Sequence, residues 1–117
     1  MTPHHARTAC RALPGCTEDQ PFGPDTLVYK VGSKVFAILP LDADPATINL
    51  KCQPDRAERL RAEYAGVMPG YHMNKRHWNT VVLDGDVPER LVEEMIRHSY
   101  ELVVNALPRA VREGLGE

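Results

Sequence analysis

Two runs of β-forming residues joined by a Gly-Ser pair constrain the fold of this 117-residue chain more than any other feature. Residues 27–31 and 34–39 are rich in Val, Leu, Ile, Tyr and Phe, and Gly32 and Ser33 lie between them. A two-residue connection that begins with Gly predicts a type II′ hairpin, because Gly supplies the positive φ of the first turn position. The expected register pairs Tyr29 with Phe36, Leu27 with Ile38 and Lys30 with Val35.

Residues 47–52 alternate apolar and polar side chains with the period of two that is typical of a strand. The two sets point to opposite faces: Ile48, Leu50 and Cys52 against Thr47, Asn49 and Lys51. This pattern predicts a half-buried strand whose second face is wet or faces a partner. A further strand is expected over 77–83, with a short one at 67–68. Residues 16–25 are predicted to be an irregular connector that Phe22 anchors on the core.

Apolar residues at helical spacing predict helices, which are expected over residues 4–14, 54–64, 86–106 and, as a short terminal turn, 109–115. Asp86 and Glu89 indicate an N-capping box, and Gly66 is the expected C-cap of the second helix. The longest helix has a broad core-facing stripe: Leu91, Val92, Met95, Ile96, Ser99, Leu102, Val103 and Ala106. The order α-β-β-β-α-β-α predicts one two-layer α+β domain over residues 1–117, with helices on one face of a mainly antiparallel sheet.

Composition excludes several classes of protein. A net charge of -2 and a pI of about 6.2 give no global basic field, so any contact with nucleic acid has to rest on a local patch. Three Cys without a CxxC pair fit a reducing compartment. The start of the chain has no apolar signal region, and no apolar run approaches the roughly 20 residues that span a bilayer. We therefore expect a soluble cytoplasmic protein that does not contact membranes.

Residues 67–80 hold the densest group of side chains that can touch a partner, including the only Trp and two of the five His. Lys and Arg can contact phosphates, and Asn and His can bind phosphates or base edges. The candidate DNA contacts are Asn74, Lys75, Arg76 and His77, with Lys51, Lys34 and Lys30 as extensions of the patch. The alternative is an ordinary solvated turn, with Trp78 in the core and His72 as a hydrogen-bonded structural histidine.

Catalytic and metal sites are not indicated. His72 and His77 lack the further convergent ligands that a zinc site needs, and His4-His5 is expected to fray, so neither a metal nor a cofactor is expected. Cys52 falls in the buried phase of its strand, which leaves Cys16 as the most exposed thiol. There is no nucleophile elbow and no Gly-rich phosphate loop after a strand, so we do not expect an enzyme.

Segments along nearly the whole chain resemble, in order and spacing, the MmcQ/YjbR-like family of double-wing DNA-binding-like proteins: residues 21–25, 29–37, 49–52, 70–80, 84–88 and 98–103. The most specific is the run Tyr-His-Met-Asn-Lys-Arg-His-Trp-Asn-Thr at 71–80. The resemblance implies a small bacterial cytoplasmic α+β domain related in fold to type III secretion chaperones. It also implies DNA binding through two hairpin wings, which by position are the Gly32-Ser33 hairpin and the 74–77 loop.

Three functions stay open at this point. The first is weak, largely electrostatic DNA binding through the basic residues. The second is a chaperone-like module that grips a peptide or a second copy through the wet sheet face or through Tyr71 and Trp78. The third is a small-ligand or enzymatic site around Tyr71, His72 and His77.

Overall fold

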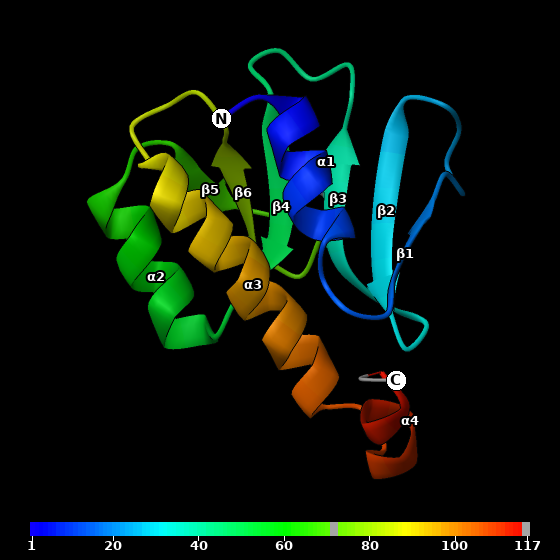
Figure 1. Cartoon of the computed structure of the whole chain (residues 1–117). Coiled ribbons are helices and arrows are strands. Elements are labelled where there is room, and N and C mark those ends of the chain that lie inside the picture. The colour runs from blue at the N-terminus through cyan, green and yellow to red at the C-terminus, as the bar shows by residue number, and fades with distance from the viewer. Residues whose placement is uncertain (71–72, 116–117) are drawn as a thin grey trace.

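The computed structural model describes residues 1–70 and 73–115, and it has an α+β architecture in which helices pack on a six-stranded sheet (Figure 1). The helices are α1 (Pro3–Arg11), α2 (Pro54–Glu63), α3 (Glu89–Asn105) and α4 (Arg109–Gly114). The strands are β1 (Cys16–Asp19), β2 (Thr26–Val31), β3 (Lys34–Pro40), β4 (Thr47–Lys51), β5 (Val67–Pro69) and β6 (Trp78–Val82). Within the described ranges, no helix is long and apolar enough to cross a bilayer.

The strands are arranged in the order β1-β2-β3-β4-β6-β5, and each neighbouring pair is antiparallel. The chain departs from sequential order once, where it passes through α2 and β5 before β6 returns to pair with β4. Figure 1 shows α1, α2 and α3 together on one side of the sheet, with α3 beside β3 and β4. The predicted fold class, helices on one face of an antiparallel sheet, is therefore confirmed.

The core lies between this sheet and its helices. Inward strand residues such as Tyr29, Leu39, Ile48 and Val81 have no exposed surface. The stripe predicted for α3 supplies the opposite wall: Val92, Met95, Ile96, Ser99 and Val103 are buried. Ala106 is exposed, because it is the C-cap residue beyond the last turn of α3. Packing against the sheet therefore ends before the predicted stripe does.

The β2–β3 hairpin forms as expected, but its turn type and most of its register differ from the prediction. Gly32 has φ 56 and Ser33 has φ 67, so both central residues are left-handed and the turn is type I′ rather than type II′. The pairing of Lys30 with Val35 is confirmed. Beyond it, Phe36 is an extra residue and the register shifts, so that Tyr29 pairs with Ala37 and Leu27 with Leu39. A β-bulge of this kind changes the direction of a side chain. Here the Phe36 and Tyr100 rings pack edge to face, with their centroids 5.5 Å apart.

The segment 16–25 was predicted to be irregular, and this is wrong for its first half. Residues Cys16–Asp19 form the edge strand β1, which pairs with β2. The strand is hard to recognise because its inward residue, Glu18, is charged, while Thr17 and Asp19 are exposed. The predicted anchor Phe22 is also wrong, since it is 75% exposed.

The predicted helix caps are wrong at two places. The N-cap of α3 is Pro88, without a side-chain hydrogen bond, and the Asp86 carboxylate instead accepts bonds from the amides of Ala65 and Gly66, each at 2.8 Å. The C-cap of α2 is Tyr64 in an extended conformation, not Gly66. Asp86 therefore fixes the turn between α2 and β5, because its oxygens bind two amides of that turn instead of amides in the first turn of α3.

Candidate nucleic-acid interface

Antiparallel pairing brings the predicted DNA contacts to one end of the sheet. The β2–β3 turn, the last residue of β4 and the first residue of β6 all lie at this end, as the ribbon of Figure 1 shows. Lys34 opens β3 opposite Val31, and Lys51 closes β4 opposite Trp78. Residues 74–77 immediately precede Trp78. We call the set Lys34, Lys51, Lys75 and Arg76 the basic end of the sheet.

Two of these lysines share a groove. It has a volume of about 330 Å³ and lies among the start of β3, the end of β4 and the residues that follow α3. We call it the basic groove, and it is lined by Lys34, Val35, Lys51, Val103, Ala106, Leu107 and Pro108. Sequence reasoning found the lysines but missed the C-terminal wall, since Leu107 carries no chemical signal of its own.

The ladder between β3 and β4 stops short of the groove residues Lys34, Val35 and Lys51. It consists of Ala37 with Leu50 and Ile38 with Asn49, and it stops at the Phe36 bulge. Beyond it the Ser99 hydroxyl of α3 takes the place of a ladder bond. It donates to the carbonyl of Phe36 and accepts from the amide of Lys51 at 2.9 Å. Ser99 is fully buried, and a polar residue in the otherwise apolar stripe of α3 was the only sequence signal for this role.

The 74–77 loop is an ordered turn. The side-chain oxygen of Asn74 accepts a bond from the amide of Arg76 at 3.0 Å, so it shapes the loop itself. Arg61 on α2 donates to the carbonyl of Lys75 at 3.0 Å, and the amide of Cys52 donates to the carbonyl of His77 at 2.7 Å. These bonds hold the backbone while the side chains of Lys75 and Arg76 stay exposed. The predicted contacts Tyr71 and His72 lie outside the described residues.

The polar face predicted for β4 is partly closed. Asn49 is buried and accepts a 2.6 Å hydrogen bond from the Thr80 hydroxyl, so the centre of this face is not wet. Trp78 is half-buried on the neighbouring strand, next to Lys51 in the register. Lys30, opposite Val35, is also half-buried. The residues of this face nearest the basic end, Lys51, Trp78 and Lys30, are thus only partly buried.

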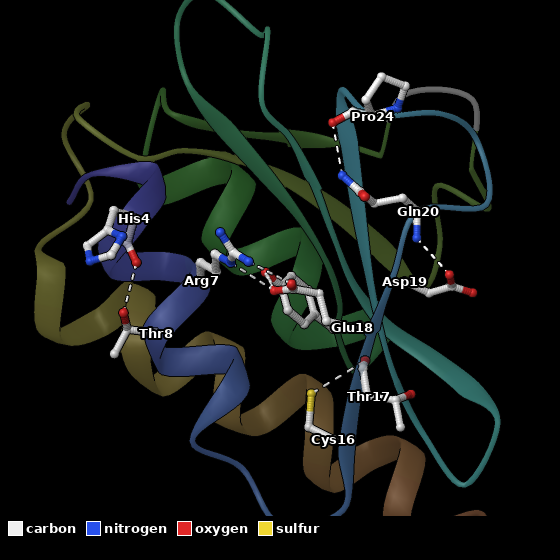
Figure 2. Close-up of polar contacts among 10 residues, drawn as sticks. His4, Arg7, Thr8, Cys16, Thr17, Glu18, Asp19, Gln20 and Pro24 are labelled. Carbon is white, nitrogen blue, oxygen red and sulfur yellow. Dashed lines mark hydrogen bonds and ion pairs between the residues drawn. The ribbon is translucent and has the colours of Figure 1, made fainter.

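A second cluster joins α1 to β1 and β2 (Figure 2). The Glu18 carboxylate accepts bonds from Arg7 at 2.9 and 3.0 Å and from the buried Tyr29 hydroxyl at 2.8 Å. The Arg7 hydrogen bonds hold the pKa of Glu18 below its usual range, because they favour the charged carboxylate. The three hydrogen bonds that the carboxylate accepts all come from members of this cluster, which indicates a structural role.

The cysteine thiols are poor nucleophiles. Burial, with a smaller contribution from the Glu18 charge, raises the pKa of Cys16 to about 11. Burial also raises the pKa values of Cys10 and Cys52. Because the thiolate is the reactive form, these thiols are almost entirely protonated and unreactive near neutral pH.

The described residues contain one group with spacing suited to a metal ion, namely His5, Glu89 and Glu93. His5 lies within α1 rather than in a frayed end. Its Nδ1 is 2.7 Å from Glu89 and its Nε2 is 3.0 Å from Glu93. Each carboxylate thus faces a different ring nitrogen, whereas a histidine ligand offers a single nitrogen to a metal. The arrangement is that of an exposed polar bridge between α1 and α3.

Comparison with known proteins finds a matching family model and relatives that agree with it. A family model described as YjbR matches residues 11–102. The uncharacterized protein YjbR of Escherichia coli K12 is 34% identical over 104 residues, covering 89% of this chain and 88% of the relative. The uncharacterized protein YbdF of Escherichia coli O157:H7 is 37% identical over 89 residues, covering 76% of this chain and 73% of the relative.

Solved structures agree with these sequence relatives. The crystal structure of a Deinococcus radiodurans protein with the family-model domain DUF419 has a TM-score of 0.90 and 41% identity, over 98% of this chain and 91% of that one. A Pseudomonas syringae crystal structure has a TM-score of 0.77 and 28% identity, over 88% and 99% of the two chains. The fold is therefore shared across the full length of the domain.

Proposed function

This chain belongs to the YjbR family, and we propose that it binds DNA weakly and electrostatically through the basic end of its sheet. The relatives are themselves named as uncharacterized, so the proposal rests on the residues of this chain. The carrying observation is that Lys34 and Lys51, from different strands, line one groove. The fold gathers positive charges there that are separated in the sequence.

The electrostatics support weak and sequence-independent binding. Lysine and arginine contact phosphates, which position a protein on nucleic acid without reading bases. The whole chain carries a net charge of -2, so attraction acts only near this patch and is screened within about 10 Å at 0.1 M salt. A binding role also fits the protonated thiols better than nucleophilic catalysis does.

The test is a titration of a labelled DNA duplex at low salt. We expect binding by the wild type that falls steeply with salt, because neutralising phosphates releases counterions. The variants Lys34→Ala/Lys51→Ala and Lys75→Ala/Arg76→Ala each remove two positive charges. Each pair should weaken binding and reduce the slope of log K against log salt by about 1.8, at about 0.9 per lost contact.

The matched control removes two exposed arginines of α3 that do not line the groove, Arg90→Ala/Arg97→Ala. It makes the same change in net charge and should retain most of the affinity and the salt slope. Undetectable binding by the wild type at low salt contradicts the proposal. So does an equal loss in the control and in the two basic-end variants.

A further inference from the structure

The lining of the basic groove has a property that phosphate binding alone does not require. Val103 is 3% exposed and Leu107 is 7% exposed, and both line the groove together with the two lysines. Phosphates are strongly hydrated and gain nothing from apolar surface. A ligand that fits both features has an apolar face or edge and negative charge on either side of it.

The groove also has an aromatic neighbour. Trp78 does not line the groove itself, but it is the cross-strand partner of Lys51 and is only half-buried. Proteins that bind single-stranded nucleic acid commonly combine lysines with an aromatic side chain on a sheet. The bases stack on the aromatic ring, and the lysines contact the phosphate backbone.

We propose that the basic end of the sheet takes single-stranded nucleic acid, with one unstacked base in the basic groove, its flanking phosphates on Lys34 and Lys51, and an adjacent base against Trp78. This inference rests on the proposed function and specifies its ligand. A duplex keeps its bases stacked and paired, so one of them can enter a concave groove only after it is unstacked and unpaired. A single strand offers the same phosphates without that cost.

The single tryptophan makes a direct experiment possible, because all intrinsic tryptophan fluorescence reports on Trp78. The full chain is titrated with an oligothymidylate of about 12 nucleotides, a length within the usual site sizes of single-strand binders. A duplex of equal length and a ribo-oligonucleotide of the same sequence are titrated in parallel. We expect quenching by the single strand and an affinity about tenfold higher than for the duplex, as one stacked base typically provides. The ribo-oligonucleotide distinguishes DNA from RNA as the source of the strand.

A neutral variant separates the groove from the charges. Ala106 is exposed and lines the groove, so Ala106→Leu narrows it without changing any charge. We expect this variant to lose the preference for single strands over the duplex, because a base no longer fits the narrowed groove. Ala110 is exposed on α4 and does not line the groove, so Ala110→Leu is the matched control and should behave like the wild type.

The outcomes separate this inference from the proposed function. Equal affinity for duplex and single strand, or an Ala106→Leu variant that keeps the single-strand preference, overturns the inference and leaves phosphate binding intact. Binding to neither nucleic acid at low salt overturns both.

Discussion

At the scale of single residues, Ser99 has a structural role that its position in the sequence does not reveal. It occurs in the apolar stripe of α3, yet its hydroxyl links the Phe36 carbonyl to the Lys51 amide. A hydroxyl can do this because it both donates and accepts. The residue therefore ends the β3–β4 ladder and fixes the backbone of a groove lysine at the same time.

We expect Ser99→Ala to lower the free energy of unfolding by about 2 kcal/mol, because it leaves a buried carbonyl and a buried amide without their partner. Denaturation by urea measures this change. Thr17→Ala, at an exposed position of β1, is the control and should cost much less. A Ser99→Ala variant as stable as the control would show that the two backbone groups find other partners.

At the scale of elements, the β2–β3 hairpin shows a conflict between turn type and sequence. A type I′ turn needs positive φ at both central residues, and Gly meets this need only at position 32. Ser33 adopts φ 67, which costs a residue with a side chain about 1–2 kcal/mol. Packing also excludes a larger side chain at position 32, since a Cβ there would lie 2.6 Å from a Leu107 methyl carbon.

We expect Ser33→Gly to stabilise the protein by about 0.5–1 kcal/mol, the relief of left-handed strain less the added flexibility of the unfolded chain. Thermal unfolding should show a midpoint about 2–6 °C higher. Ser33→Ala retains the strain and serves as the comparison. If glycine gives no gain over alanine at this position, the turn does not have the left-handed geometry described above.

At the scale of the whole molecule, the two ends of the sheet have different surfaces. The basic end carries the lysines, whereas the loops at the opposite end expose Phe22 to 75% and Leu41 to 45%. These loops are adjacent, since the amide of Leu41 donates to the carbonyl of Asp25 at 2.7 Å. Any protein contact through Phe22 would therefore leave the basic end free.

We expect Phe22→Asp to leave the affinity for nucleic acid within about twofold of the wild type. The strands β2 and β3, about 20 Å long at about 3.3 Å per residue, separate its new charge from the basic groove by more than a Debye length. The DNA titration described above measures this. Phe22→Ala controls for loss of the ring without added charge. A large loss of DNA affinity in Phe22→Asp alone would mean that the acidic charge acts across the whole molecule and that the interface is not confined to one end.

Much of the architecture was predictable because periodicity is a local property. Strand alternation over 47–52, the two runs around Gly32 and the stripe of α3 each follow from which side chains must leave water. The failures have a common physical origin. Each wrongly predicted feature depends on partners distant in the sequence. β1 depends on the bonds of Glu18 with Arg7 and Tyr29, and the Phe36 bulge on contacts with Tyr100 and Ser99. The position of the Asp86 carboxylate depends on the amides of Ala65 and Gly66.

The sequence by itself determined the α+β class, the family and the identity of the basic residues, since these depend on side-chain pattern and type. Tertiary structure alone decided that Lys34 and Lys51 share a groove, that Leu107 and Val103 help to line it, and that Asn74 shapes its own loop. The reason is that residues distant in the sequence meet only where the register of the strands and the end of the β3–β4 ladder bring them together. A bulge and one buried hydroxyl set both. The bulge has no signature in the local sequence, and the hydroxyl appears there only as one polar residue in the apolar stripe of α3.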